Sequence, residues 1–255
     1  RTGGGAGGEG EAGQRQKETR KGLKGKCVRG TGGGGAIGAA ICRRFAEAGA
    51  KIIVADRNAE AAQRVATEVG GRALAFDISD YAAAKSAVES AGQVDVLVNN
   101  AGWDRFQNFI DMDPADWEQL IAINLRGPLN MHHVVVPQMA KRGWGRVVNI
   151  SSDAARVGSS GESVYSACKG GILSFSKTLA RELARKGVTV NVVCPGPTDT
   201  PILRGFAGEG EAGQKVMAAL VRAVPPKPVG RPAQGPSTVP PPPTGPARSP
   251  GPPPT

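Results

Sequence analysis

Two side chains of this 255-residue sequence, Tyr165 and Lys169, are spaced to share one chemical task. They lie four residues apart in a segment with helical apolar spacing, so both should lie on one face of one helix. A phenol has a pKa of about 10 and is a weak base at neutral pH, but a neighbouring ammonium group favours the phenolate. Ser152 ends an apolar strand and would direct its hydroxyl group at the same point. The arrangement predicts a hydride-transfer site that holds one substrate oxygen, although the same spacing also arises by chance in helices.

A glycine-rich turn near the start of the chain indicates a dinucleotide site. Strand, turn, amphipathic helix and second strand are expected over residues 26–30, 31–38, 36–47 and 51–56. The second strand ends in Asp56, 18 residues past Gly38. Glycines let the backbone approach a pyrophosphate at a helix N-terminus, and a carboxylate at this distance can accept hydrogen bonds from ribose hydroxyls.

The elements that must position these residues follow from the rest of the pattern. Helices are expected over 59–69, 80–91, 114–125, 128–142 and 163–186, and strands over 72–76, 94–98, 146–151 and 188–193. Apolar strands that alternate with amphipathic helices predict a parallel sheet. The expected fold class is therefore α/β, a single Rossmann-like doubly wound parallel sheet with helices on both faces.

Ligands of doubly wound sheets bind at the carboxyl ends of the strands. Five of the expected strand ends carry polar or turn-forming residues, namely Asp56, Asp77, Asn99, Ser152 and Pro195-Gly196. We therefore expect the substrate and the dinucleotide to meet at this edge of the sheet.

Taken together, these motifs resemble the short-chain dehydrogenase/reductase family over about residues 22–224. The resemblance is carried, in the order and spacing of that family, by Thr31-Gly32 through Gly38, Asn99-Asn100-Ala101-Gly102, Asn124, Ser152, Tyr165-x-x-x-Lys169 and Pro195-Gly196. Ser152 also lies 13 residues before Tyr165, which is the spacing that the family requires.

The resemblance implies a role for each of four residues. Tyr165 would be the general base toward a secondary alcohol, and Lys169 would lower its pKa and bind the nicotinamide ribose. Ser152 would hydrogen-bond the reacting oxygen. Asn124 would hold a water that passes the proton from Lys169 to solvent. An asparagine at a helix kink can instead satisfy backbone groups alone, so two interpretations of Asn124 are open.

The resemblance also implies a nicotinamide cofactor and a small-molecule substrate. NAD is expected because Asp56 would repel the 2′-phosphate of NADP and the glycine turn carries no basic residue, although Arg57 alongside leaves some ambiguity. The cofactor contacts expected are Gly32, Gly35, Ile37, Gly38, Asp56, Asp77, Ile78, Asn99, Ala101, Gly102, Tyr165, Lys169, Pro195, Gly196, Thr198 and Thr200. Helices 114–142 and 163–186 would form a two-fold interface in a homodimer or homotetramer.

Four segments narrow the resemblance to family members that oxidise cyclic 2-hydroxyacyl-CoA thioesters during bacterial breakdown of alicyclic and aromatic acids. These segments are residues 99–104, 130–133, 152–162 and 193–200. One alternative is a 3-oxoacyl thioester reductase acting on CoA or acyl-carrier-protein substrates, which would share every catalytic residue. The other is a dinucleotide-binding scaffold without turnover.

The first strand and the glycine turn depart from the family pattern. Ala36 stands where the family usually has its second fingerprint glycine. Arg29 and Gly30 interrupt a central strand that should be apolar, and an unpaired buried arginine destabilises a fold by several kcal/mol.

Both ends of the chain depart further. Residues 1–21 are expected to be a disordered extension, 200–221 a helical cover over the substrate, and 225–255, with 14 prolines, a disordered tail. The last strand of the family is therefore expected to be missing. Because the family pattern stops abruptly at each end, we expect these ends to come from the wrong reading frame of a GC-rich gene.

The net charge of +10 lies mainly at the ends, since residues 1–26 and 222–255 contribute +4 each. The rest of the chain carries only +2, which argues against a nucleic-acid partner. No apolar run has the length of a membrane span, and the N-terminus has no apolar signal segment, so a cytoplasmic location is expected. The four cysteines show no metal-binding spacing. His132 and His133, expected at a helix surface or interface, cannot build a metal site.

Overall fold

The structure, a computed structural model, describes residues 23–196 and residue 198. The extension 1–21, the helical cover 200–221, Thr200 and the proline-rich tail 225–255 all lie outside these residues. The strand predicted to be missing from the C-terminus falls there as well.

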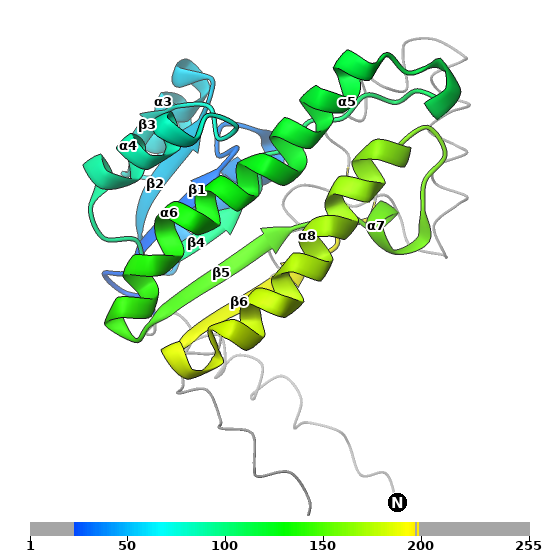
Figure 1. Cartoon of the computed structure of the whole chain (residues 1–255). Coiled ribbons are helices and arrows are strands. Elements are labelled where there is room, and N and C mark those ends of the chain that lie inside the picture. The colour runs from blue at the N-terminus through cyan, green and yellow to red at the C-terminus, as the bar shows by residue number, and fades with distance from the viewer. Residues whose placement is uncertain (1–22, 197, 199–255) are drawn as a thin grey trace, which may run out of the picture.

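Within the described residues, six parallel strands form one sheet in the order β3-β2-β1-β4-β5-β6 (Figure 1). They are β1 (Cys27–Thr31), β2 (Lys51–Asp56), β3 (Arg72–Ala75), β4 (Val96–Asn99), β5 (Gly145–Ile150) and β6 (Val188–Val193). The chain winds in opposite directions from the central pair, β1 and β4, which is the switch point where such sheets bind ligands. The predicted α/β class is confirmed, and each strand starts or ends within two residues of its predicted bounds.

Helices cover both faces of the sheet (Figure 1). One face carries α2 (Ala36–Glu47) and α3 (Ala59–Glu68), and the other carries α4 (Tyr81–Ala91), α6 (Gly127–Arg142) and α8 (Ser163–Glu182). Shorter elements that the sequence did not predict are η1 (Phe109–Asp111), α7 (Ala154–Val157) and η3 (Ala184–Lys186), the last of which replaces the final turn predicted for α8.

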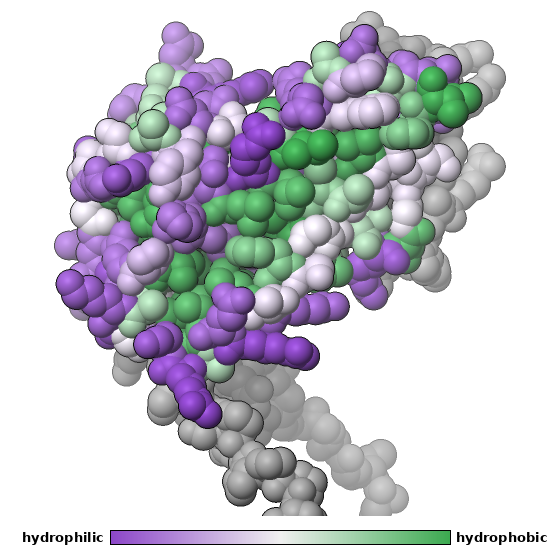
Figure 2. Space-filling model, in the orientation of Figure 1, coloured by the Kyte–Doolittle hydropathy of each residue, from purple (hydrophilic) through white to green (hydrophobic). Residues whose placement is uncertain are grey.

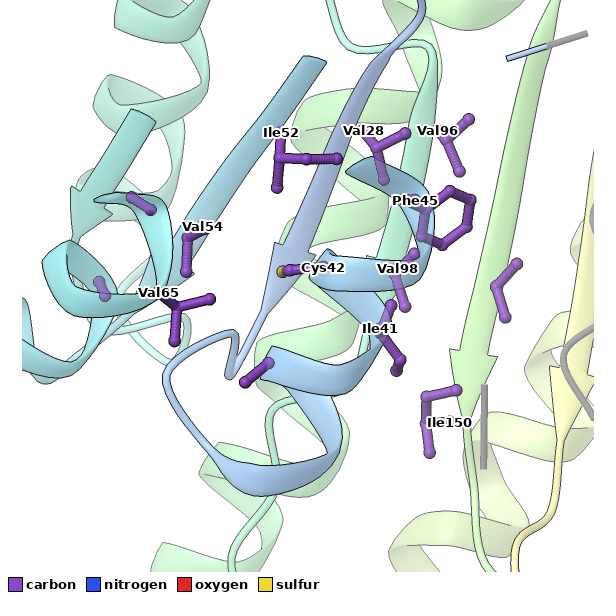
Figure 3. Packing of buried hydrophobic residues seen from close by; sticks show 14 of the residues in the cluster. Val28, Ile41, Cys42, Phe45, Ile52, Val54, Val65, Val96, Val98 and Ile150 are labelled. Atoms are coloured by element: carbon purple, nitrogen blue, oxygen red, sulfur yellow. The ribbon is translucent and has the colours of Figure 1, made fainter. Parts of the chain in front are cut away.

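The core under α2 and α3 joins these helices to the centre of the sheet (Figure 3). Its labelled side chains are Val28, Ile41, Cys42, Phe45, Ile52, Val54, Val65, Val96, Val98 and Ile150. β-Branched residues on neighbouring strands form a continuous apolar surface, against which the helix places Ile41 and Phe45. This packing fixes the N-terminus of α2 over the ends of β1 and β2.

A long helical rod forms where the sequence predicted two helices (Figure 1). It begins as α5 (Pro114–Ile121), widens into the π-helical turn η2 (Ala122–Arg126) and continues directly into α6. A π-turn holds one extra residue and turns a side chain inward, and here the residue is Asn124, which is fully buried.

β1 forms a complete strand even though Arg29 lies in it. Its residues pair with β2 along its whole length and with β4 from Val28 onward. Arg29 is 0% exposed, and its Nη2 donates to the carbonyl oxygen of Ala87 at 3.2 Å. Among the described residues its Nε and Nη1 have no hydrogen-bond partner, and burial lowers its pKa to about 10. The predicted first strand is therefore confirmed despite its broken apolar pattern, and the buried arginine is confirmed as well.

None of the helices in the described part of the chain is both long and apolar enough to cross a bilayer. In these same residues, histidine, cysteine and carboxylate side chains form no group of three or more that could bind a metal ion.

Candidate active site

The residues predicted to bind ligands meet at one edge of the sheet because all six described strands run in the same direction. β1, β2 and β4 end at Thr31, Asp56 and Asn99, and β5 and β6 are followed by Ser152 and Pro195. Residues from five separate parts of the chain therefore surround the switch point.

The glycine-rich turn fits a dinucleotide because side chains would obstruct it. Gly32 has a positive φ of +63°, and a Cβ there would lie 2.7 Å from Cα of Ala101. A Cβ on Gly38 would lie within 2.0 Å of the carbonyl oxygen of Gly32. Gly35 is the N-cap of α2 and offers no capping side chain, so the first backbone N–H groups of the helix are available to an anion. Ala36, which replaces the usual glycine, is the first residue of the helix.

Asp56 lies at the rim of this turn. Its Oδ2 accepts from the backbone N–H of Gly34 at 3.0 Å, and its Oδ1 accepts from that of Asn58 at 2.9 Å. Arg64 of α3 reaches the same place, since its Nη2 donates to the carbonyl oxygen of Gly34 at 3.5 Å. The glycine turn itself carries no basic residue, and the sequence gives no sign of Arg64 there because the contact depends on how α3 packs beside β2.

The segment after β4 forms the floor beneath the turn. The hydroxyl oxygen of Thr31 accepts from the backbone N–H groups of Asn100 and Ala101 at 3.1 and 3.2 Å. The side chain of Asn100 donates to the carbonyl oxygens of Thr31 and Gly32. Asn99, predicted to touch the cofactor, instead places its side chain inside the protein, where its Nδ2 donates to Asn149 at 2.8 Å.

Asp77 and Ile78, both predicted to contact the cofactor, differ in their environments. Asp77 is exposed and accepts from the backbone N–H and hydroxyl groups of Ser79 at 2.8 and 2.7 Å. Ile78 is buried, and its side chain contacts the position where a Cβ on Gly127 would lie. The backbone of Ile78, rather than its side chain, faces the polar groups around it, since its carbonyl oxygen accepts from Asn130 at 2.9 Å.

The segment after β6 lies beside the segment after β5. The backbone N–H of Asp153 donates to the carbonyl oxygen of Pro195 at 2.9 Å, so Pro195 and Ser152 are neighbours. Thr198 donates from its hydroxyl group to the carbonyl oxygen of Gly196 at 3.1 Å. These contacts place the predicted cofactor contacts Pro195, Gly196 and Thr198 next to the predicted catalytic serine.

Ser152, Tyr165 and Lys169 come together as the sequence predicted. Ser152 lies close enough to Tyr165 to lower the pKa of its phenol. The Nζ of Lys169 lies 5.5 Å from the centre of the Tyr165 ring and donates to the carbonyl oxygen of Ile150 at 3.1 Å. α8 supplies the tyrosine and the lysine from successive turns of one face, and the end of β5 supplies the serine.

Asn124 reaches the same place through Gly102. A Cβ on Gly102 would lie 3.1 Å from Oδ1 of Asn124 and 3.3 Å from Nζ of Lys169, so both groups flank one backbone position. The Asn124 side chain donates to the carbonyl oxygens of Trp103 and Leu120 at 2.6 and 3.0 Å and accepts from the N–H of Trp103 at 3.2 Å. It therefore satisfies backbone groups and also lies beside the lysine.

The electrostatics of Tyr165 differ from the prediction. Burial raises the pKa of Tyr165 above its ordinary value, and the carboxylates of Asp104 and Glu162 raise it further, while the neighbouring Ser152 lowers it. Burial lowers the pKa of Lys169 to about 8. In the chain alone, burial of the phenol therefore outweighs any lowering of its pKa by the Lys169 ammonium, and the predicted role of Lys169 stays a prediction.

Behind the site lies a buried polar network that sequence reasoning missed. Nδ2 of Asn149 on β5 contacts Nε2 of His132 at 3.1 Å and donates to the hydroxyl of Ser176 at 2.8 Å. Nδ1 of His132 lies 2.6 Å from the carbonyl oxygen of Pro128. His132 is only 2% exposed, so its predicted place at the surface is wrong, whereas His133 is exposed. Asparagine within an otherwise apolar strand was the available signal.

Comparisons with known proteins agree with this geometry. The family model described as short chain dehydrogenase matches residues 26–209. Nodulation protein G from Azospirillum brasilense is 40% identical over 79% of this chain and 84% of its own length. Acetoacetyl-CoA reductase from Cupriavidus necator is 38% identical over 80% and 85%.

The 3-oxoacyl-acyl-carrier-protein reductase from Escherichia coli is 36% identical over 75% of this chain and 81% of its own length. A crystal structure of a protein named ribose-5-phosphate isomerase, from Brucella melitensis 16M, superimposes with a TM-score of 0.78. It is 34% identical and covers 85% of this chain and 84% of its own. The order of the site residues along the chain, the parallel sheet and the match of the family model all agree, and the chain belongs to the short-chain dehydrogenase family.

Proposed function

We propose that this protein transfers hydride between a secondary alcohol and NAD, with Tyr165 as the proton acceptor. The observation that carries the proposal is the meeting of Ser152, Tyr165, Lys169 and Asn124 at the carboxyl edge of the sheet, beside a glycine turn that fits a dinucleotide. A bound nicotinamide would supply the hydride acceptor. Gly32, Gly35, Gly38 and the start of α2 would hold its pyrophosphate.

Four side chains would bind the substrate oxygen and transfer its proton. Ser152 donates to the carbinol oxygen and keeps it within reach of Tyr165, whose phenolate oxygen takes the carbinol proton as the carbonyl forms. Lys169, deep in the site, supplies positive charge near the developing phenolate and a donor for the ribose. Asn124 would hold a water next to Lys169, through which the proton leaves. These assignments follow the positions of the side chains and the chemistry of each group.

The cofactor proposed is NAD because the Asp56 carboxylate lies at the edge of the turn, where a 2′-phosphate would meet its negative charge. Arg64 and Arg57 oppose this preference, since both are cationic and exposed near the same rim. The balance of charge between Asp56 and these arginines therefore sets the preference between NAD and NADP.

The substrate proposed is a cyclic 2-hydroxyacyl-CoA. Residues 99–104, 130–133, 152–162 and 193–200 are similar to 2-hydroxycyclohexanecarboxyl-CoA dehydrogenase, which supports this choice. The loops that leave β4 and β5 also expose apolar side chains, with Phe109 52%, Ile110 90% and Val157 74% accessible. Exposed apolar side chains on segments that follow β4 and β5 suit an acyl group better than a sugar or a free acid.

A second candidate is a 3-oxoacyl thioester reductase. It is favoured by the names of two relatives, acetoacetyl-CoA reductase and 3-oxoacyl-acyl-carrier-protein reductase, each of which matches at least three quarters of this chain. Both candidates use the same four side chains, so the shape of the acyl site distinguishes them.

A substrate panel with both nicotinamide cofactors tests the proposal. The purified chain is assayed with cyclic 2-hydroxyacyl-CoA, linear 3-hydroxyacyl-CoA and 3-oxoacyl thioesters on CoA and acyl carrier protein. A kcat/KM at least about tenfold higher for the cyclic thioester with NAD supports the first candidate, and the reverse order supports the second. Nucleotide binding by calorimetry without turnover on any member would identify a non-catalytic scaffold and overturn both.

A further inference from the structure

Four buried polar side chains between β5 and the helices α6 and α8 have no part in the chemistry proposed above. They are Asn149 of β5, Ser151 just after it, His132 of α6 and Ser176 of α8, and each is at most 4% exposed. We call these four side chains the β5–α8 cluster. A buried polar group destabilises a fold unless it is hydrogen-bonded, so the bonds of this cluster restrict how the helices can lie on the sheet.

The contacts of His132 determine the direction of the hydrogen bonds. Its Nδ1 lies 2.6 Å from the carbonyl oxygen of Pro128, which can only accept, so in the neutral ring Nδ1 carries the proton. Nε2 is then an acceptor, and Nδ2 of Asn149 donates to it at 3.1 Å. The second Nδ2 hydrogen of Asn149 is donated to the hydroxyl oxygen of Ser176 at 2.8 Å. Ser176 in turn donates to the carbonyl oxygen of Ile172 at 2.6 Å, so each N–H and O–H of these three side chains has an acceptor.

A second contact holds α8 closer to the catalytic residues. The hydroxyl group of Ser151 donates to the carbonyl oxygen of Lys169 at 2.9 Å. Ser151 is itself fixed to the sheet, since its backbone N–H donates to the carbonyl oxygen of Val193 at 2.8 Å. Ser176 lies about two helical turns after Lys169, and Tyr165 lies about one turn before it. The hydrogen bonds from β5 therefore reach the same face of α8 that carries the tyrosine and the lysine.

These two contacts determine where α8 lies along and around its own axis. Apolar packing is not directional, so by itself it would let α8 slide or rotate on the sheet with little loss of burial. A slide or a rotation would break both contacts and leave buried donors without acceptors. Because a misplacement of about 1 Å can lower a rate by about 10²-fold, such a restriction on α8 matters for the groups that it carries.

We propose that the β5–α8 cluster fixes the position of α8 on the sheet and thereby sets the distance from Tyr165 and Lys169 to Ser152. The polar groups of the cluster bond to one another or to backbone carbonyl groups, so its four members are positioning residues and act through α8. Their effect on the place of Tyr165 is a property of the folded chain, whereas their effect on turnover rests on the proposed function.

The direction of the hydrogen bonds has a test that needs neither substrate nor cofactor. The chain has only two histidines, so in a His133→Gln background the ring-nitrogen NMR signals of labelled histidine report His132 alone. At pH 7 these signals should show a neutral ring with its proton on Nδ1. A ring with a proton on Nε2, whether neutral or charged, cannot accept from Asn149 and overturns the proposal.

The position of α8 is tested through Tyr165, again without substrate. The chain has only two tyrosines, so in a Tyr81→Phe background the fluorine NMR signal of 3-fluorotyrosine reports Tyr165 alone. Ser176→Ala removes a hydroxyl group of the cluster and should shift that signal by more than its linewidth. Ser176→Thr keeps a hydroxyl group that can donate to the carbonyl oxygen four residues earlier, and it should restore the signal. Ser174→Ala, at an exposed position of the same helix, is the matched control and should leave the signal unchanged.

An unmoved fluorine signal in folded Ser176→Ala overturns the proposal. If Ser176→Ala does not fold, Ser151→Ala removes the contact with the Lys169 carbonyl group and provides the same test. A shifted signal in that variant supports the proposal, and an unmoved one overturns it.

Turnover then separates this proposal from the proposed function. In Ser176→Ala, kcat for alcohol oxidation per folded molecule should fall by about tenfold or more while KM changes by less than about threefold, because the substrate still binds but the reacting groups are misplaced. A residue that only stabilises the fold would lower the folded fraction and leave this kcat unchanged. If the fluorine signal moves but no alcohol is oxidised by any form, the positioning is supported and the proposed function fails. If turnover is intact and kcat is unchanged in Ser176→Ala, the positioning alone is wrong.

Discussion

At the scale of single residues, the proposed chemistry depends on one proton transfer to Tyr165. Burial raises the pKa of the phenol, and the neighbouring Ser152 lowers it. Lys169 is 4% exposed and donates to a backbone carbonyl, so its positive charge is held in place by the fold. Substitutions at these positions should therefore separate proton transfer from nucleotide binding.

We expect Tyr165→Phe to lower kcat/KM for alcohol oxidation by about 10²–10⁴-fold and to leave nucleotide affinity within a few-fold, because the ring still packs but no proton acceptor remains. Lys169→Met should weaken nucleotide binding as well. Steady-state kinetics and calorimetric titration with NAD measure the two effects. Tyr81→Phe, which changes the exposed tyrosine of α4, is the control. A loss of less than about tenfold in Tyr165→Phe would exclude the assigned role.

Asp56 should decide the cofactor preference through its charge. Asp56→Asn keeps an acceptor for the backbone N–H of Gly34 and removes the negative charge. We expect the ratio of kcat/KM for NAD to that for NADP to fall by about tenfold or more, since the 2′-phosphate is no longer repelled.

Arg64→Ala in the Asp56→Asn background should then lower efficiency with NADP, because it removes the cation beside Gly34. Equal efficiency with both cofactors in the unmodified chain, or an unchanged ratio in Asp56→Asn, would contradict the assignment.

At the scale of secondary-structure elements, β1 shows how a strand can form around an unsuitable residue. Its neighbours β2 and β4 supply the backbone hydrogen bonds and the apolar surface that keep it in register. Arg29 is then buried with two of its three guanidinium nitrogens lacking a hydrogen-bond partner among the described residues. The unsatisfied guanidinium group therefore lowers the free energy of unfolding of the whole domain.

We expect Arg29→Leu to increase the free energy of unfolding by about 1–4 kcal/mol, because it replaces a buried charge with an apolar side chain. Urea denaturation followed by circular dichroism measures the change. Arg44→Leu, at an exposed position of α2, should change stability by no more than about 0.5 kcal/mol. Destabilisation by Arg29→Leu would show that the guanidinium has a partner that stabilises it.

The buried His132 of α6 should make the fold sensitive to acid. Burial lowers its pKa from 6.5 to about 4. Between pH 6.5 and pH 4, the histidine is therefore protonated in the unfolded chain and neutral in the folded protein. Its contribution to stability is full above pH 6.5 and falls as the pH drops to 4, by about 3 kcal/mol in total.

Urea unfolding from pH 7 to pH 4 measures this dependence in the native chain and in His132→Gln, which should lose the part due to the histidine. His133→Gln changes the exposed neighbour and should keep the full dependence. The same slope in both variants would show that other groups cause the acid sensitivity.

At the scale of the whole molecule, the face formed by α6 and α8 is the best candidate for contact with a second copy. Figure 2 shows apolar side chains gathered over these two helices, with polar side chains around them. Long neighbouring helices can pair with the same helices of a second copy about a two-fold axis. The proposed homodimer or homotetramer rests on this face.

Light scattering at micromolar concentration should therefore give a dimeric or larger mass. Ser174→Arg, at an exposed position of α8, should shift the mass toward the monomer by placing a charge in the interface, whereas Ala82→Arg on α4 should not. A monomeric mass for the unmodified chain rules out this interface.

Three features could be predicted from the sequence alone: the fold class, the edge of the sheet that carries the site, and the proximity of Ser152, Tyr165 and Lys169. These three features follow from the local periodicity of the sequence and from the rule that parallel strands end at a common edge of the sheet. The glycine turn was equally predictable, because its positive φ and close contacts exclude side chains.

Which distant side chains meet depends on the tertiary packing. His132 is buried against Asn149, and Arg64 contacts Gly34, so that residues 17 and 30 positions apart in the chain lie together. Asn124 points inward because it lies in a π-helical turn, and the periodicity of the sequence does not predict such a turn. The physical reason is that helical and strand periods fix which face a residue occupies, whereas the contacts of that face depend on the packing of several elements at once.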